Sequence, residues 1–212
     1  MKQEKKNIAI IYSGSRDGGG IDTYLKNLFA GYDKKKLSLT LVSLGDWRLT
    51  KEFEEKKYKV VRLTGKRVSR ILIQDLIDTI RNRKIDLIVS QGMVANFYGR
   101  ITAVLTKTPS LVVIHSDYNF DYPDEAKRLL YKVTDKASEK ATSKYIFVSK
   151  YLKSISPAIQ QEKGVVIYNG VKANGIVKRG KPGKKIVIGS VGRLHYTKGF
   201  HNLIEEIGRA HV

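Results

Sequence analysis

Short apolar runs alternate with amphipathic segments over residues 1–171, and this alternation restricts the fold more than any other feature of the sequence. The runs are rich in valine, isoleucine and leucine and show little polar alternation, which is typical of strands buried on both faces. Strands are predicted at residues 8–12, 39–44, 60–63, 87–90, 111–115, 145–148 and 165–168. Helical spacing predicts helices at residues 21–30, 71–80, 124–141 and 150–160. Strands that alternate with helices predict an α/β fold built on a doubly wound parallel sheet.

The composition changes after Val171. Residues 172–185 are rich in glycine, lysine and proline with few apolar side chains, which indicates an interdomain linker. A new strand is predicted at 186–191 and a new helix at 200–206. One strand and one helix cannot bury a core. We therefore expect a first domain over 1–171 and, over 186–206, only the truncated start of a second.

The last six residues, 207–212, have a different character. Gly208 is expected to break the helical pattern, and the segment matches the translation of a common sequencing adapter. We therefore expect an artefactual tail to a longer reading frame and leave these residues out of the site.

The chain is strongly basic. Forty lysines and arginines oppose 20 aspartates and glutamates, which gives a net charge of +20. Residues 56–70 hold seven cations and residues 172–185 hold six, with no acidic residue in either segment. A solvated basic surface is one interpretation, and contact with an anionic membrane is the functional one. Nucleic acid is not expected as a partner, because no basic-aromatic platform or recognition motif accompanies the charge.

The composition also excludes several classes of protein. The chain has no cysteine, which rules out disulfides and thiolate metal sites. No apolar run approaches the 18 residues of a membrane span, and the first run, at 8–12, is too short for a signal peptide. We expect a cytoplasmic protein, either soluble or at the inner face of the cell membrane.

A glycine-rich segment, Ser-Gly-Ser-Arg-Asp-Gly-Gly-Gly at residues 13–20, joins the first strand to the first helix. Glycine lets the backbone approach a ligand closely, and the N-terminus of the next helix attracts phosphate. The segment is neither a P-loop nor a complete dinucleotide fingerprint. An ordinary flexible turn is the alternative, and Asp22 is best explained as a complement to the helix dipole.

Polar residues follow two of the later strands. His115 and Asp117 lie at the carboxyl end of the strand predicted at 111–115, where ligands bind in open α/β sheets. A histidine at this position can contact a sugar hydroxyl or a phosphate or move a proton, and a packed polar side chain is the alternative. No second histidine lies nearby in the sequence to suggest a metal. Asn169 and Gly170 form a turn after the last strand and mark the edge of the domain.

The most specific motif is Gly-Ser-Val-Gly-Arg-Leu-His-Tyr-Thr-Lys-Gly-Phe at residues 189–200. Arg193 and Lys198 stand in a loop that enters a helix. Two cations beside a helix N-terminus would clamp a diphosphate and stabilise charge on a leaving nucleotide. Two surface cations of a basic protein are the alternative.

In this order, the four motifs resemble glycosyltransferase family 4, retaining enzymes of the two-Rossmann glycosyltransferase B fold, over roughly residues 8–206. The resemblance implies a Rossmann-like N-terminal domain for the acceptor and a C-terminal domain for a nucleotide sugar. It places His115 as a catalytic residue near the transferred sugar, and Asp117 and Asn169 near the acceptor or sugar. The donor diphosphate would bind at Gly19, Gly20, Arg193 and Lys198. It implies no metal and no cofactor, the nucleotide-diphosphate sugar being a co-substrate.

One departure from the family pattern matters. The family's two donor-facing glutamates lie beyond residue 212, and Glu205 and Glu206 belong to a different helix. The chain is therefore expected to be inactive alone. The predicted function is transfer of a hexosyl or N-acetylhexosaminyl group to a lipid-linked, polysaccharide or other glycan acceptor. The alternatives are a nucleotide-sugar epimerase of the same fold and a non-catalytic, basic nucleic-acid-binding domain.

Overall fold

The computed structural model describes residues 4–14, 19–64, 70–117, 124–171, 187–192, 194 and 196–209. Contacts within the chain divide it into two compact units, residues 1–172 and 173–212.

The first unit is built on a seven-stranded sheet in which every pair of neighbouring strands is parallel. The strand order is β3-β2-β1-β4-β5-β6-β7. The strands are β1 (Lys6–Tyr12), β2 (Leu37–Ser43), β3 (Lys59–Arg62), β4 (Leu87–Gln91), β5 (Ser110–Ile114), β6 (Lys144–Phe147) and β7 (Gly164–Val166). All seven predicted strands are confirmed, as is the α/β fold with a parallel sheet.

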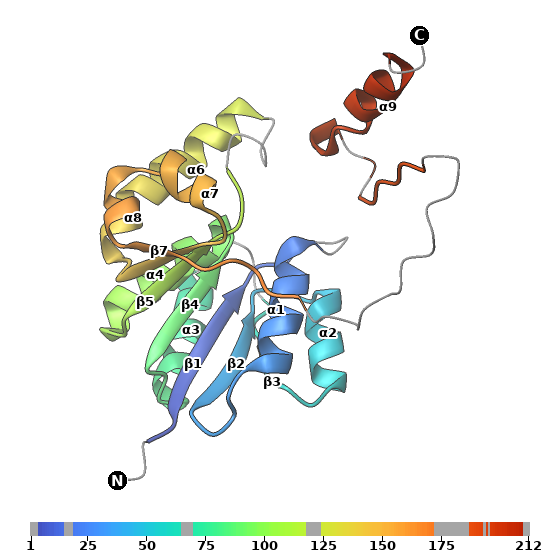
Figure 1. Cartoon of the computed structure of the whole chain (residues 1–212). Helices are drawn as coiled ribbons and strands as arrows, with labels where there is room; N and C mark the ends of the chain where they lie inside the picture. Colours follow the sequence, from blue (N-terminus) through green and yellow to red (C-terminus); the bar gives the residue numbers. More distant parts are fainter. Residues whose placement is uncertain are drawn as a thin grey trace. The chain divides into compact units, whose positions relative to one another are not determined.

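Helices cover both faces of the sheet, as Figure 1 shows. On one face, α1 (Gly20–Gly31) and α2 (Arg48–Glu55) pack with Ile10 and Tyr12 of β1. On the other, α3 (Arg70–Asn82) and α4 (Met93–Thr106) pack with Ala9 and Ile11. Successive residues of β1 therefore enter two different cores, which explains why the strand sequences show no polar alternation.

The helices at the end of the unit follow the prediction with one change. The segment predicted at 124–141 forms α6 (Glu125–Ser138) and a short 3-10 turn, η1 (Glu139–Ala141). The single helix predicted at 150–160 is wrong, because it divides into α7 (Lys150–Ile155) and α8 (Ala158–Glu162). Ser156 between them is extended, with φ −81° and ψ 158°. Proline at 157 disfavours the helical conformation of the residue before it.

The second unit contains η2 (Tyr196–Lys198) and α9 (Phe200–Arg209). The predicted helix is confirmed, but Gly208 lies inside it and does not end it. The strand predicted at 186–191 is absent from the described residues 187–191. A strand requires a hydrogen-bonded neighbour, and no described segment pairs with these residues. None of the residues of α9 is buried.

A buried ion pair ties together the helices beside β6. Arg100 of α4 and Asp135 of α6 are only 1% and 6% exposed, and the guanidinium donates to the carboxylate. Arg100 Nε also donates to Thr142 Oγ1 (2.8 Å), and Asp135 Oδ2 accepts from Gln160 Nε2 of α8 (2.9 Å). Tyr145 of β6 accepts a further guanidinium hydrogen bond at 3.2 Å. The charges are thus paired and hydrogen-bonded, as burial requires.

Breaking this pair from one side should destabilise the unit strongly. Replacement of Arg100 by Met leaves the Asp135 carboxylate buried without its cation, and we expect a loss of about 3–5 kcal/mol in the free energy of unfolding. Urea denaturation measures it. The double variant Arg100→Met/Asp135→Leu should recover part of the loss, because no charge is then buried alone.

The exposed ion pair Lys6–Asp86, with 3.4 Å between Nζ and Oδ1, is the matched control. Lys6→Met should cost less than about 1 kcal/mol. Equal losses for Arg100→Met and Lys6→Met would show that the buried network does not hold the helices.

Candidate functional site

The strand order has a switch point between β1 and β4. From β1 the chain moves outward to β2 and β3, and then returns to the other side of β1 with β4. The loops that leave the carboxyl ends of β1 and β4 therefore diverge to opposite faces of the sheet. In open α/β sheets, ligands bind in the crevice that this divergence creates.

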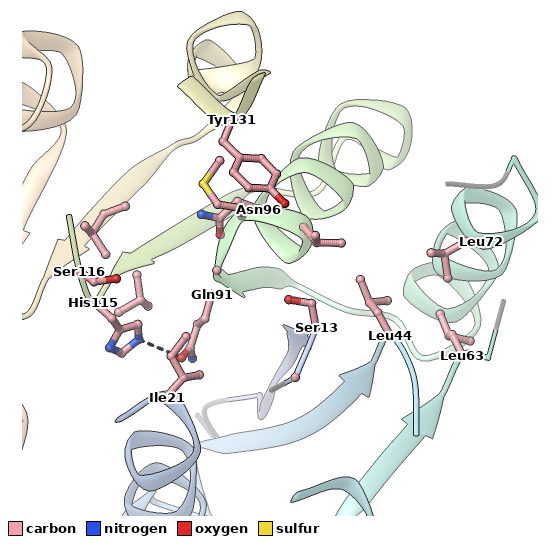
Figure 2. Close-up of a pocket in the computed structure, with 16 residues that line it drawn as sticks. Ser13, Ile21, Leu44, Leu63, Leu72, Gln91, Asn96, His115, Ser116 and Tyr131 are labelled. Atoms are coloured by element: carbon pink, nitrogen blue, oxygen red, sulfur yellow. Dashed lines mark hydrogen bonds between the residues drawn. The ribbon is translucent and has the colours of Figure 1, made fainter. Parts of the chain in front are cut away.

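A cavity of about 290 Å³ lies at this edge. Residues that follow five of the strands line it, together with side chains of α1, α3, α4 and α6 (Figure 2). The residues after strands are Ser13 and Gly14, Leu44, Leu63, Gly92, and His115 and Ser116. The volume is near the lower end for small-molecule pockets, which suits a group the size of one ring.

The first loop of the cavity is shaped by a tryptophan. Gly14 has φ +70°, and a Cβ added there would lie 2.1 Å from the Trp47 ring. No side chain can therefore replace this hydrogen without moving the indole or the loop. The packing of Trp47 against the loop therefore requires glycine at position 14.

His115 is held at the cavity by two contacts. Its Nε2 lies 3.0 Å from Gln91 Oε1 (Figure 2). Its ring packs edge-on against Tyr24 with 4.9 Å between ring centroids. The amide oxygen can only accept, so His115 Nε2 carries the hydrogen and donates it. The neutral ring then has Nδ1 as an acceptor. Gln91 thereby fixes both the orientation and the tautomer of the imidazole.

Burial lowers the pKa of His115 from 6.5 to about 4. The ring is therefore uncharged near pH 7. A base with so low a pKa takes up little proton at neutral pH, which favours a hydrogen-bonding role over a proton-moving one.

Two buried amides in the cavity lack partners. Gln91 Nε2 and Asn96 Oδ1 make no hydrogen bond within the described protein, although the two residues are only 1% and 3% exposed. Both residues line the cavity. Buried polar groups are nearly always paired, so these two atoms are candidate contacts for a polar ligand.

The predicted glycines lie at the start of α1. Gly19 is the N-cap, with φ −177° and ψ −169°, and its carbonyl accepts from Thr23 N at 3.2 Å. Gly20 opens the helix, and among the described residues no atom outside its chain neighbours and the helix backbone lies within 4 Å of where its Cβ would be. Neither glycine is among the described residues that line the cavity.

Two other predicted residues are not among the described residues that line this cavity. Asp117 lines a second cavity with residues of α6, α7 and α8, including Lys132 and Gln160. Asn169 is exposed in the segment that follows β7. The next residue, Gly170, accepts a hydrogen bond from Asn27 of α1 at 3.1 Å, so this segment returns to the first helix.

The predicted diphosphate clamp belongs to the second unit. Lys198 ends η2 and is exposed, and Gly199 after it has φ +67°. Arg193 lies outside the described residues. The linker segment 172–185 is also outside them, as are Ile186 and the end of the predicted tail.

Sequence analysis did not predict Gln91 or Asn96. The position of Gln91 could have indicated a site residue, because it lies at the end of a buried strand, as His115 does. Asn96 lies in the first turn of α4, a helix that was not predicted. Eight of the 14 residues of α4 are buried, on more than one face, so its sequence shows no clear apolar stripe.

Two searches of the described residues were negative. No group of three or more His, Asp or Glu side chains there could hold a metal ion. Among the described helices, none has both the length and the hydropathy needed to cross a bilayer.

The comparison with protein families matches residues 18–174 to Glycosyltransferase Family 4. The match covers more than half of the chain, and the chain belongs to this family. No curated protein sequence matches the chain.

Solved structures share the fold at low sequence identity. Anabaena Alr3699/HepE in complex with UDP-glucose has a TM-score of 0.62 at 18% identity, covering 78% of this chain and 44% of that one. A glycosyltransferase from Rickettsia africae has a TM-score of 0.54 at 19% identity, covering 79% and 44%. The apo form of WaaB, a lipopolysaccharide outer core galactosyltransferase, has 0.58 at 13% identity, covering 83% and 50%. This chain thus spans about half or less of the chains it resembles.

The low pKa of His115 predicts a loss of stability in mild acid. In the unfolded chain the ring takes up its proton near pH 6.5, whereas the folded ring does so only near pH 4. The unfolded state therefore binds more protons as the pH falls from 6.5 to 4, and stability falls with it. Between pH 7 and pH 4.5, His115 should contribute a loss of about 2–3 kcal/mol.

The measurement is urea denaturation at both pH values for the native chain and His115→Asn. The variant should lose less stability than the native chain over this range. The same loss in both proteins would show that the imidazole is not desolvated in the folded state.

Proposed function

We propose that this chain forms the acceptor-side domain of a retaining glycosyltransferase. The reaction would move a hexosyl or N-acetylhexosaminyl group from a nucleotide-diphosphate sugar to a lipid-linked, polysaccharide or other glycan acceptor. The observation that carries the proposal is the cavity at the carboxyl edge of the sheet, whose described lining holds no charged side chain, with His115 fixed by Gln91 at its rim. The similarity to a protein solved with UDP-glucose supports the nucleotide-sugar donor.

Each predicted residue has a proposed role. The open N-terminus of α1 at Gly19 and Gly20 would face the donor diphosphate, where the helix dipole favours negative charge. His115 would contact the transferred sugar through a hydrogen bond. Asp117, in the neighbouring cavity, and Asn169, in the segment bonded to α1, would lie on the acceptor side.

Arg193 and Lys198 would clamp the diphosphate from the second unit. Positive charge from these two side chains would take the part that a metal ion plays in other transferases, so we propose that the reaction needs no metal and no cofactor. Because the chain spans 44% of the HepE chain, we propose further that the 212 residues are inactive alone.

The test uses the chain extended through its downstream coding sequence. Labelled nucleotide sugar is incubated with and without a glycan or lipid-linked acceptor. Acceptor-dependent transfer with the anomeric configuration kept supports the proposal. Release of an epimerised sugar without acceptor would instead establish an epimerase. Steeply salt-dependent binding to duplex DNA, unaffected by nucleotide sugar, would point to the nucleic-acid-binding alternative.

Replacement of Arg193 or Lys198 by Ala in the extended protein should lower turnover by roughly 10²-fold or more, because each would stabilise charge on the leaving diphosphate. Steady-state kinetics with saturating donor measures it. Arg209→Ala is the matched control, since Arg209 is an arginine of the same unit that pairs with Glu205 and Glu206. Turnover that stays the same in all three variants would remove the clamp from the mechanism.

We also propose a peripheral contact with anionic membrane at the inner face of the cell, but not through the whole basic segment at 56–70. Lys59 opens β3 and Arg62 ends it, so the segment runs along the strand and its two ends lie at opposite edges of the sheet. Acidic residues of the α2 region also offset it, with Lys56 bound to Glu52 and Arg62 to Asp46 and Glu54. A lipid-linked acceptor must reach the cavity at the carboxyl edge, which favours Arg70 at the start of α3, the helix whose Leu72 lines the cavity. Lys66 and Arg67 lie outside the described residues, and we propose that they act with Arg70.

Replacement of Lys66, Arg67 and Arg70 by Gln should weaken binding to anionic liposomes by roughly 1 kcal/mol per residue. Replacement of Lys56, Lys57 and Lys59 removes the same charge at the amino edge, and we expect a smaller loss. Sedimentation with phosphatidylglycerol vesicles, and with neutral vesicles as a control, measures both. Binding that neither triple variant changes would mean that the segment is only a solvated surface.

A further inference from the structure

The two unpartnered amide atoms of the cavity differ in chemistry. Gln91 Nε2 is a hydrogen-bond donor, and Asn96 Oδ1 is an acceptor. Leaving a buried donor or acceptor unpaired destabilises the folded protein. A ligand that satisfies both atoms recovers this cost on binding, so the pair defines what the cavity accepts.

A donor beside an acceptor selects against ions. A phosphate or carboxylate would meet the oxygen of Asn96, which cannot donate to it, and a cation would meet the amide hydrogens of Gln91. The described lining holds no lysine, arginine, aspartate or glutamate, and His115 is neutral at pH 7. A hydroxyl group can both donate and accept, so the cavity suits an uncharged ligand that carries hydroxyl groups.

Part of the remaining wall is apolar. Leu44, Leu63 and Val94 line the cavity together with the polar groups (Figure 2 labels the two leucines). A sugar ring has hydroxyls at its rim and C–H groups on its faces, and this combination matches a cavity with both kinds of wall.

The Gln91 amide and the backbone of Asn96 are also held in place. Gln91 cannot turn without losing the hydrogen bond from His115 Nε2 (3.0 Å). The backbone of Asn96 is fixed in the first turn of α4, where its N–H donates to Gly92 O at 2.8 Å. Groups fixed before binding lose little freedom when the ligand arrives.

We propose that this cavity is a subsite for an uncharged sugar ring, in which Gln91 donates to one ring hydroxyl and Asn96 accepts from another. The two residues thus select a neutral sugar over an acidic one. This inference rests on the proposed function and adds to it the class of sugar, because a glycosyltransferase could equally take a uronic acid.

The experiment uses the 212-residue chain and binding alone. Methyl α-glucopyranoside, its deoxy analogues and methyl glucuronide are titrated against the chain and followed by the amide signals of the protein in NMR. Inorganic phosphate is titrated in parallel as the anion. The neutral glycoside should bind, the glucuronide and phosphate at least about tenfold more weakly, and at least one deoxy analogue about tenfold more weakly.

The key variant is Asn96→Leu, which keeps the size of the side chain and removes its oxygen. Affinity for the neutral glycoside should fall about tenfold, while the melting temperature should not fall, because an unpaired buried acceptor is removed. Thr102→Val is the matched control. Thr102 is buried on the same helix with an unpartnered Oγ1 but lies outside the described lining of the cavity. Its replacement should leave sugar binding unchanged.

Several outcomes overturn the inference. These are equal or tighter binding of the glucuronide or phosphate, no binding of any sugar, and native affinity in Asn96→Leu. If Asn96→Leu does not fold, the deoxy analogues decide, since they test the same contacts on the native chain. Transfer by the extended protein with no sugar bound here would reject the subsite and keep the transferase. Sugar binding in this cavity without any transfer by the extended protein would keep the subsite and reject the transferase.

Discussion

Parallel pairing of all the strands is the constraint on which the rest of the first unit depends. Because each pair is parallel, every strand ends at the same edge of the sheet, and residues far apart in the sequence meet there. Ser13, Gln91 and His115 line one cavity only because β1, β4 and β5 are neighbours in this order. The helices on both faces exclude water from the strands, so polar side chains of the sheet lie mainly at the strand ends.

The strands were predictable because burial on both faces produces a simple sequence pattern, a short run of valine, isoleucine and leucine. The helices were less so. α1 and α3 bury one face against the sheet and show the expected spacing, whereas α4 packs against the sheet, α3 and α6 together and shows none. The break at Ser156 was readable from Pro157 and was missed. The predicted strand at 186–191 failed because pairing depends on a neighbour and not on composition.

The candidate site also has some features that the sequence predicts and others that it does not. His115 was predictable from its place after a strand, and its neutral state was not, because that state depends on how much water the neighbouring helices exclude. The contact between Gln91 and His115 joins residues 24 positions apart, which no local pattern reveals. In the basic segment at 56–70, Lys56 and Arg62 pair with acidic residues in and beside α2, which the clustering of cations in the sequence does not reveal.

The buried network around Arg100 also determines how this domain can be recombined with others. Its members come from α4, α6 and α8, so a chimera joined anywhere between residues 100 and 160 would inherit Arg100 and Gln160 from different parents. A junction after Val171 keeps the whole network, and the bond from Asn27 to Gly170, on one side. Exchange of the chain after residue 171 among family members is therefore best made at that junction, and homologues should vary Arg100, Asp135 and Gln160 together.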